Sequence, residues 1–326
     1  MVRSFIPTLL SASILASRRF FTPSQAAPLP LFDLRSSDDN SASTTNVSND
    51  TVTSDFLRPA FFSRIAYCSS DAVQSFTCGA PCEAAGSDID VFQVGGNDGT
   101  IPMYFVAHDP STNTIVVAHQ GTDPNNLLSI LNDAKFGLVD LNTTRFTAAD
   151  GKGIQVHEGF QDTFERTADS MLAGVQQGLA ANNAKNVLVT GHSLGAAVAT
   201  LDAMFLKENL DPSVQLTTTV FGLPRVGNQA WADFVDSSLG SSLSFITNQH
   251  DPVPTVPPEF LGFVHPSGEN HITSVDSNGQ ATGFIACPGQ DNENCASGNS
   301  LLDVSISNHL GPYFDDISFG ASACPA

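Results

Sequence analysis

Hydrophobic positions alternate between short apolar runs and longer helical patterns from about Phe56 onward. Apolar residues at spacings of three and four predict an amphipathic helix over Phe160–Ala181, and a second helix fits Ala196–Glu208. Six runs rich in β-branched and aromatic residues have the length of strands: Asp90–Val94, Met103–Ala107, Thr114–His119, Val187–Thr190, Thr217–Phe221 and Leu243–Thr247. Strands that alternate with helices predict an α/β fold built on a central mixed sheet.

The first 55 residues differ in character from the rest. Arg3 is followed by an uncharged, mostly apolar run, and small residues near Ala26 resemble a cleavage site, so residues 1–26 are expected to be a signal peptide. Arg18 and Arg19 interrupt the run, which leaves a disordered cytosolic tail as the alternative. Residues 27–55 end in a polar stretch that predicts a disordered pro-segment or linker. Residues 56–326 are expected to form a single catalytic domain.

Composition narrows the possible functions. The chain has 326 residues, 41% hydrophobic and 14% charged, which is enough for a substantial core. Its formal net charge of −20 excludes nucleic acid as a partner and disfavours electrostatic docking on anionic lipid. No run reaches the 18 or so apolar residues that a transmembrane helix requires. Any contact with a membrane surface would therefore have to be apolar.

Cysteines and sequons favour an extracellular protein. The six cysteines are an even number, and none forms a metal-binding Cys-x-x-Cys pair. Sequons for N-glycosylation begin at Asn46, Asn49 and Asn142. Two disulfides are expected from local turns, Cys78–Cys82 around Gly-Ala-Pro and Cys287–Cys295 around a polar loop.

The candidate nucleophile is Ser193. It lies in Gly191–Gly195, which reads Gly-His-Ser-Leu-Gly and is the only Gly-x-Ser-x-Gly string in the chain. The string follows the apolar run Asn186–Thr190 and opens directly into the helix expected from Ala196. A sharp turn from strand to helix exposes a serine hydroxyl, and the helix N-terminus offers N–H groups to an oxyanion.

A serine nucleophile needs a base and an orienting acid, which follow it in the chain in hydrolases of this type. The candidate bases are His250, His265, His271 and His309; the turn-rich stretch Asn308–Pro312 favours His309 without excluding the others. The candidate acids are Asp202, Asp211, Asp233, Asp236, Asp251, Asp276 and Asp303. Asp251 stands out because it follows the strand expected at Leu243–Thr247, and catalytic groups gather at the carboxyl ends of strands. Asp202 lies within the helix after Ser193, where a solvated or structural role is expected.

The chain resembles the fungal class 3 lipases, an α/β-hydrolase group that includes filamentous-fungal triacylglycerol lipases and type A feruloyl esterases. The similarity spans about Ala66 to Tyr313. It rests on these strings: Ala66–Cys68, His119–Thr122, Val156–Phe160, the Gly191–Gly195 turn, Phe221–Asn228 with its Pro-Arg-Val-Gly-Asn sequence, and Asp251–Pro254. The resemblance implies an α/β-hydrolase fold with a central mixed, mostly parallel sheet flanked by helices.

The resemblance also implies roles for individual residues. Ser193 would be the nucleophile, Asp251 the acid and His309 the base, while Thr122 and Leu194 would donate the N–H groups of the oxyanion hole. It further implies a Cys68–Cys324 disulfide. No metal or organic cofactor is needed for this chemistry, and we expect a monomer.

The chain departs from the family in one place. The family commonly has Phe-Arg before the oxyanion Gly-Ser or Gly-Thr, whereas this chain has His119-Gln120. Loss of the arginine removes a structural ion pair, so we expect a rearrangement behind the oxyanion loop without loss of a catalytic group.

The segment after Thr122 bears on the substrate. Asp123–Ala134 is expected to be a lid helix whose apolar face carries Leu127, Leu128, Ile130 and Leu131; a helix packed permanently on the core is the alternative. A lid of this kind favours a secreted triacylglycerol lipase that forms an acyl-enzyme on Ser193 and binds acylglycerol at a lipid–water interface. The alternatives are a feruloyl or other small-ester carboxylesterase and, more remotely, a non-catalytic hydrolase-fold binding module.

Overall fold

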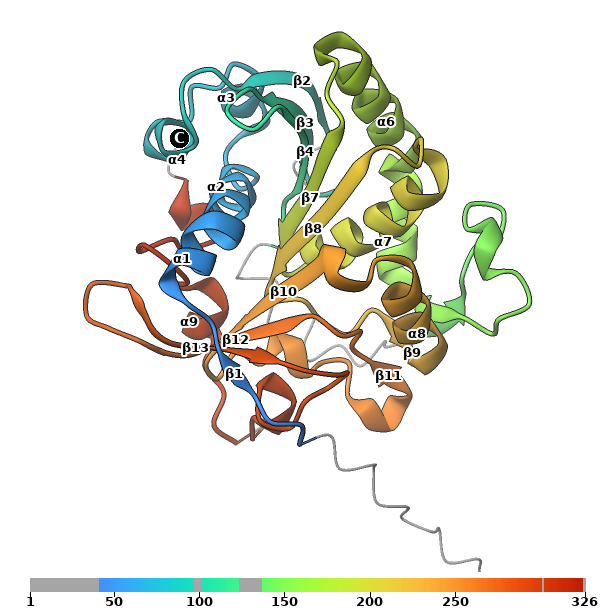
Figure 1. The fold of residues 1–326 in the computed structure, drawn as a ribbon, viewed down its shortest axis with the longest axis vertical. Helices are drawn as coiled ribbons and strands as arrows, with labels where there is room; N and C mark the ends of the chain where they lie inside the picture. The colour runs from blue at the N-terminus through green and yellow to red at the C-terminus, as the bar shows by residue number, and fades with distance from the viewer. Residues whose placement is uncertain (1–40, 97–100, 123–136, 301, 325–326) are drawn as a thin grey trace, which may run out of the picture. The chain divides into compact units, whose positions relative to one another are not determined.

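A nine-stranded mixed sheet organises the structure, a computed structural model that describes residues 41–96, 101–122, 137–300 and 302–324 (Figure 1). The strands run across it in the order β1-β13-β12-β10-β8-β7-β4-β3-β2. Their bounds are β1 (Thr45–Asn46), β2 (Asp90–Gly95), β3 (Tyr104–Asp109), β4 (Thr114–His119), β7 (Asn186–His192), β8 (Gln215–Phe221), β10 (Leu243–Asn248), β12 (Glu269–Val275) and β13 (Ala281–Cys287). All six strands expected from the sequence are present.

The centre of the sheet is parallel and its edges are antiparallel. Strands β4, β7, β8, β10 and β12 run parallel to one another, and each pair of neighbours within this group is parallel. The β2–β3–β4 meander closes one side, and β12–β13–β1 closes the other with antiparallel pairs. Because the parallel strands all end at the same edge, the loops that leave them are brought together there.

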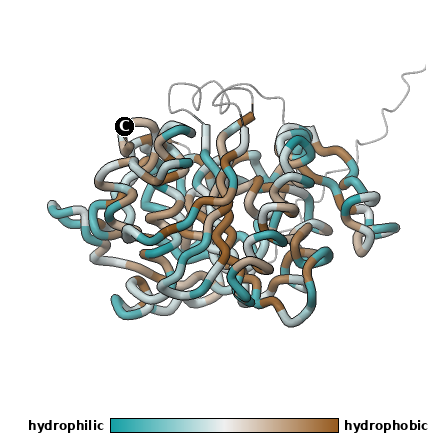
Figure 2. The backbone as a smooth tube through the Cα atoms, turned by 90° about the horizontal axis from the view of Figure 1, so that it is seen from above, coloured by the Kyte–Doolittle hydropathy of each residue, from teal (hydrophilic) through white to brown (hydrophobic). Residues whose placement is uncertain are grey.

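Helices cover both faces of the sheet. On one face lie α6 (Glu158–Asn182) and α7 (Leu194–Asn209), the two helices expected from the sequence. On the other lie α2 (Leu57–Ile65), α3 (Ser70–Gln74) and α4 (Ala80–Ala85). Strand β4 contributes side chains to the hydrophobic cores on both faces. Ile115 and Val117 pack with α6 and α7, whereas Val116 and Ala118 pack with α2. Figure 2 shows the resulting band of hydrophobic strands through the middle of the molecule.

A second, four-stranded antiparallel sheet lies beyond α6. Its order is β11-β9-β6-β5, and its strands are β5 (Leu138–Asp140), β6 (Gln155–His157), β9 (Gly227–Asn228) and β11 (Phe263–Val264). Helix α8 (Gln229–Ser238) packs on it through the fully buried Trp231. The remaining short helices are α1 (Asn49–Thr51), η1 (Val52–Phe56), η2 (Thr147–Ala149), η3 (Gly240–Ser242), η4 (Val253–Thr255), η5 (Glu259–Leu261), η6 (Ala296–Gly298), α9 (Ile306–Leu310) and η7 (Ala321–Ala323).

The end of the expected linker is structured, whereas the sequence predicted that it would be disordered. Asn46 and its neighbour Thr45 pair with β13, and the side chain of Ser48 caps α1. Phe56 then packs against Phe284 and Phe314, with ring centroids 5.7 and 6.3 Å away. Backbone pairing at the sheet edge orders this segment despite its polar side chains, because the edge supplies hydrogen bonds whatever the side chains are. Residues 1–40, which include the expected signal peptide, lie outside the described residues.

Three disulfides tie the fold together. Cys68–Cys324 joins the end of the α2 region to the C-terminal segment, and Cys78–Cys82 and Cys287–Cys295 close short loops. They are the three pairs named from the sequence and the family resemblance. None of the described helices combines the length and the apolar character that crossing a bilayer requires.

Candidate active site

Three of the expected site residues follow the carboxyl ends of parallel strands of the central sheet, where β4 and β7 are neighbours and β8 separates β7 from β10. Thr122 follows β4, Ser193 follows β7 directly, and Asp251 follows β10. These strands lie within the parallel part of the sheet, so the three loops leave the same edge.

Ser193 occupies a strained turn between β7 and α7. Its backbone has φ 61° and ψ −128°, a region that residues with side chains rarely adopt. The flanking glycines make the turn possible, because a Cβ on Gly191 would lie 2.5 Å from the Gly195 carbonyl oxygen. The Ser193 N–H donates to the Phe221 carbonyl at 2.9 Å. Helix α7 starts at the next residue, so its N-terminus faces the serine.

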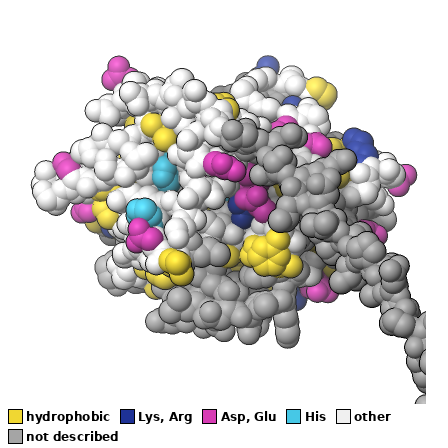
Figure 3. All heavy atoms as spheres, turned by 90° about the horizontal axis from the view of Figure 1, so that it is seen from below, with side chains coloured by type: hydrophobic (Ala, Val, Ile, Leu, Met, Phe, Trp, Pro, Cys, Tyr) yellow, Lys and Arg dark blue, Asp and Glu magenta, His cyan; other side chains and the backbone are white. Residues whose placement is uncertain are grey.

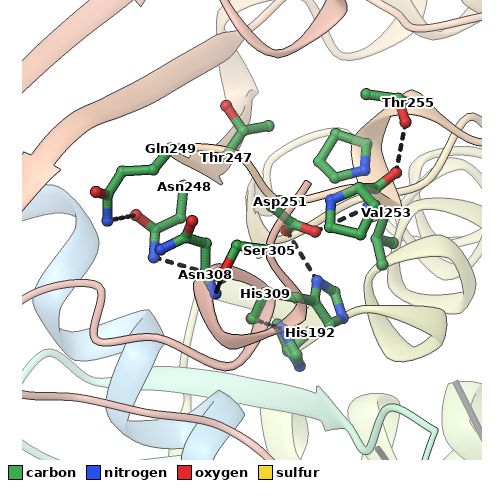
Figure 4. Close-up of polar contacts among 12 residues, drawn as sticks. His192, Thr247, Asn248, Gln249, Asp251, Val253, Thr255, Ser305, Asn308 and His309 are labelled. Carbon is green, nitrogen blue, oxygen red and sulfur yellow. Dashed lines mark hydrogen bonds and ion pairs between the residues drawn. The ribbon is translucent and has the colours of Figure 1, made fainter. Parts of the chain in front are cut away.

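Asp251 and His309 form a buried pair (Figure 4). The distance between Asp251 Oδ2 and His309 Nδ1 is 2.8 Å, and each side chain is 1% exposed. The other carboxylate oxygen of Asp251 accepts from the Val253 N–H at 2.8 Å. His309 Nε2 is buried and has no hydrogen-bond partner among the described residues. The imidazole is thus oriented by the acid on one side and keeps its other nitrogen available, as a general base requires.

His192, the residue before Ser193, holds His309 against the turn. Its Nε2 lies 2.8 Å from the His309 carbonyl oxygen, so Nε2 carries the proton, and Nδ1 accepts from the Tyr67 hydroxyl at 2.6 Å. The rings of His192 and His309 lie 4.3 Å apart. Burial and the neighbouring His309 hold the pKa of His192 well below its usual value, so it stays neutral. A Cβ on Gly222 would lie 2.8 Å from the His309 ring, so glycine is needed there.

Asn248, at the end of β10, fixes the loop that carries the base. Its buried amide donates to the Asn308 carbonyl at 2.9 Å and to the Pro312 carbonyl at 3.0 Å, one on each side of His309. The Ser305 N–H also donates to the His250 carbonyl at 2.9 Å. The strand that leads to Asp251 therefore also holds the loop of His309.

The other candidate bases are occupied elsewhere. His250 is half exposed and lies 3.9 Å from Asp303. His265 Nε2 lies 2.9 Å from the Pro254 carbonyl, and His271 Nδ1 lies 2.7 Å from the Thr247 hydroxyl. Burial lowers the pKa of both His265 and His271 to about 4.

The residues expected to form the oxyanion hole lie in the loop after β4 and directly after Ser193. Thr122 lies three residues after the end of β4, and its hydroxyl is buried with no hydrogen-bond partner among the described residues. Leu194 is the first residue of α7. The expected lid, with Leu127, Leu128, Ile130 and Leu131, lies outside the described residues.

His119 and Gln120, which stand where the family commonly has Phe-Arg, both make buried or backbone contacts. His119 Nε2 lies 2.5 Å from Asp202 Oδ2. Gln120 turns its side-chain oxygen to the Met103 N–H at 3.1 Å. Asp202 is therefore buried beside His119 and is not solvated.

Arg225, from the Pro-Arg-Val-Gly-Asn string, anchors the loop that follows the acid. It is 2% exposed and donates to the carbonyl oxygens of Thr255 and Pro257 at 2.8 and 3.2 Å. It also pairs with Asp291 at 2.9 Å and with Glu259 at 2.7 Å. These contacts fix the main chain between the acid and η5.

Glu269 is a buried carboxyl beneath this loop. It accepts from the Thr247 hydroxyl at 2.7 Å and from the Ala296 N–H at 3.0 Å. Burial raises its pKa to about 7, against the lowering effect of those two hydrogen bonds. The nearby Cys287 and Cys295 could complete a metal site in outline, but both are in a disulfide and offer no thiolate.

Comparisons with known proteins identify similar chains. The family model described as Lipase (class 3) matches residues 116–261. The secreted mono- and diacylglycerol lipase LIP2 of Malassezia restricta is 37% identical over 65% of this chain and 65% of its own length. The secreted mono- and diacylglycerol lipase MDL3 of Malassezia globosa is 36% identical over 70% of this chain and 73% of its own length. The chain thus spans about two thirds of LIP2 and somewhat more of MDL3.

Solved structures share the fold. The triacylglyceride lipase of Rhizomucor miehei superposes with a TM-score of 0.73 at 25% identity, covering 86% of this chain and 99% of its own. The nine-stranded sheet and its flanking helices are therefore those of an α/β-hydrolase of the fungal lipase type.

Glu269 makes the stability of the fold depend on pH. Its pKa is about 7 in the folded protein against an ordinary value of 4.5, so the folded state binds the proton more tightly. The contribution of Glu269 to the free energy of unfolding is therefore greatest below about pH 4.5. It falls by about 3 kcal/mol as the pH rises to about 7. We predict that Glu269→Gln, which keeps both accepted hydrogen bonds, raises the free energy of unfolding in urea at pH 8 and changes it little at pH 4. Glu83→Gln, at an exposed position, serves as the control; an equal effect of Glu269→Gln at both pH values would contradict the prediction.

Proposed function

The chain belongs to the class 3 lipase family, and on this premise we propose that it is a secreted serine hydrolase that cleaves acylglycerol esters through an acyl-enzyme on Ser193. The observation that carries the proposal is the buried Asp251–His309 pair beside the strained turn of Ser193. We propose Ser193 as nucleophile, His309 as base and Asp251 as orienting acid.

The proposed reaction follows from these positions. His309 Nε2 takes the proton of Ser193 Oγ as that oxygen attacks the ester carbonyl. The backbone N–H groups of Thr122 and Leu194 bind the oxyanion that forms, each contributing about 2.7–4 kcal/mol to the transition state. When the tetrahedral intermediate collapses, His309 returns the proton to the departing alcohol. Water then repeats the sequence on the acyl-enzyme, releasing the fatty acid and restoring Ser193.

Relatives indicate the class of substrate. The two Malassezia proteins are named for mono- and diacylglycerols, and the Rhizomucor enzyme for triacylglycerides. We therefore propose acylglycerols as substrates and a lipid–water interface as the place of action. A panel of triolein, diolein, monoolein, tributyrin and methyl ferulate tests the choice; methyl ferulate hydrolysed faster than every acylglycerol would favour a feruloyl esterase.

Secretion is part of the proposal. Three disulfides are stable in an oxidising compartment and rare in the cytosol. The side chains of Asn46 and Asn49 are exposed, as glycosylation requires, and these are the sequons we expect to be modified. At the third sequon, the Asn142 amide donates to Glu165 at 2.6 Å, so a glycan there would displace that contact.

Exposed apolar side chains gather on the two loops that flank the acid and the base. Among the described residues, the large hydrophobic side chains that are exposed are Phe260, Leu261, Leu302 and Val304. The first two lie in η5, after the acid loop, and the other two lie in the segment that leads to His309. Phe260 is 84% exposed and Leu302 is 98% exposed. Figure 3 shows a face with separate groups of hydrophobic side chains and acidic side chains between them.

These four residues, which we call the apolar rim, support contact with an acylglycerol surface. Burying a Phe or Leu side chain contributes about 1.5–3 kcal/mol. The negative charge of the chain disfavours electrostatic attachment to anionic lipid, so apolar contact has to supply the attraction.

The proposed nucleophile gives a direct test. Ser193→Ala should lower kcat on p-nitrophenyl butyrate by about 10⁶-fold, because loss of a triad nucleophile leaves only binding and oxyanion effects. Circular dichroism should show an unchanged fold, and Ser237→Ala, at an exposed position in α8, should remain fully active. Retention of a tenth of the wild-type rate by Ser193→Ala would refute the assignment, and an inactive wild type would favour a binding module.

A further prediction concerns the apolar rim. The double variant Phe260→Ser/Leu302→Ser should adsorb less to a triolein emulsion and hydrolyse it at least about fivefold more slowly, since two anchoring side chains are lost. Hydrolysis of soluble p-nitrophenyl butyrate should be unchanged.

Asn278→Ser, in the exposed turn between β12 and β13, controls for surface substitution and should behave as wild type on both substrates. Equal losses on emulsion and soluble ester in the double variant would show that the rim acts on the catalytic loops instead of on the interface.

A further inference from the structure

Two buried ionisable side chains outside the triad face each other behind the oxyanion loop. His119 ends β4 and is 3% exposed, while Asp202 lies in the third turn of α7 and is fully buried. The distance between His119 Nε2 and Asp202 Oδ2 is 2.5 Å. The proposed triad uses neither residue.

The pair is isolated in an apolar environment. Asp202 is surrounded by the core that α7 forms with the sheet, and neither of its oxygens has another hydrogen-bond partner among the described residues. The Tyr104 ring stacks on His119 with centroids 5.5 Å apart, but its hydroxyl contacts Ser170 and Gln93 instead. Burial raises the pKa of Asp202 and the neighbouring His119 opposes that rise. Each side chain is therefore the polar partner on which the other depends, since a lone buried charge is strongly unfavourable.

The pair joins the two elements that carry the proposed oxyanion donors. Thr122 lies three residues after His119, and Leu194 opens the helix that contains Asp202. The main chains of these elements already touch: a Cβ on Gly195 would lie 2.5 Å from the His119 carbonyl oxygen and 2.7 Å from that of Gln120. The close contact limits how near the two elements can come, and the His119–Asp202 attraction opposes their separation.

We propose that His119 and Asp202 form a clamp that sets the distance between the Thr122 and Leu194 amides, and that they act as positioning residues for ester hydrolysis. The inference rests on the proposed function. Oxyanion donors stabilise the transition state only when both lie at hydrogen-bond distance from the developing charge. Loosening the clamp should therefore lower kcat while leaving KM on a soluble ester nearly unchanged.

The experiment measures kcat, KM and the melting temperature of the full chain with p-nitrophenyl butyrate. Asp202→Leu removes the carboxylate, and Asp202→Asn keeps an oxygen that can accept from His119 Nε2. His119→Phe/Asp202→Leu removes both polar groups, so no lone charge is buried and the fold should be stabilised relative to Asp202→Leu. Asp109→Asn is the matched control, because Asp109 is also buried and pairs with Arg58, but at the far end of β3.

We expect Asp202→Leu to lose at least about tenfold in kcat, short of the 10²–10³-fold lost with a whole oxyanion donor. KM should stay within about twofold, and Asp202→Asn should recover most of kcat. The double variant should regain melting temperature without regaining kcat, and Asp109→Asn should lose melting temperature without losing kcat.

Two results would overturn the proposed clamp role of the pair. The first is a kcat of the double variant within twofold of wild type, which remains measurable even if Asp202→Leu fails to fold. The second is a loss of kcat in Asp109→Asn equal to that in Asp202→Leu. This result would show that the His119–Asp202 pair contributes only to the stability of the fold. Failure of the proposed function looks different, because the wild type would then hydrolyse no ester, and both proposals would fall together.

Discussion

Close contact between main chains at the turn after β7 is the constraint on which the site depends. Gly191 packs against Gly195, and Gly195 packs against the carbonyl oxygens of His119 and Gln120, with no room for a side chain at either glycine. This contact forces Ser193 into positive φ and brings the start of α7 to the loop after β4. Any larger residue would push the nucleophile and the oxyanion loop apart. The strain is offset by the sheet and the helix core on both sides.

The acid and base are assembled mainly by main-chain and amide hydrogen bonds around one ionisable pair. Asn248 holds carbonyl oxygens on both sides of His309, and His192 holds the carbonyl of His309 itself. His192 stays neutral, so these supports do not add charge beside the base. Arg225 does carry a charge, but it lies in contact with the loop beyond Asp251, where it pairs with Asp291 and Glu259. The surplus of acidic residues in the chain therefore affects its solubility and the kinds of surface that it can bind, and not the charge beside His309.

Sequence patterns predicted the parallel centre of the sheet and the helices α6 and α7, because their apolar periods are long and regular. They missed β12 and β13, where buried polar residues such as Glu269 and His271 interrupt the alternation. They also missed β1 and the small sheet, whose strands are two or three residues long and are held by backbone pairing. Local patterns pointed to Ser193 and Asp251 and favoured His309, whereas excluding the other three histidines required the family resemblance. The contact between His119 and Asp202 had no local signal, since packing alone brings β4 and α7 together.

The central claim is that the Asp251–His309 pair activates Ser193, and covalent labelling tests it most directly. A p-nitrophenyl alkylphosphonate forms a stable adduct with a serine only where a base removes its proton and an oxyanion hole binds the phosphoryl oxygen. Peptide mass spectrometry of the treated protein should find one adduct per chain, on the peptide that contains Ser193. The same treatment of His309→Ala should give no adduct. An adduct on another serine, or labelling of Ser193 that persists at the wild-type rate without His309, would contradict the account.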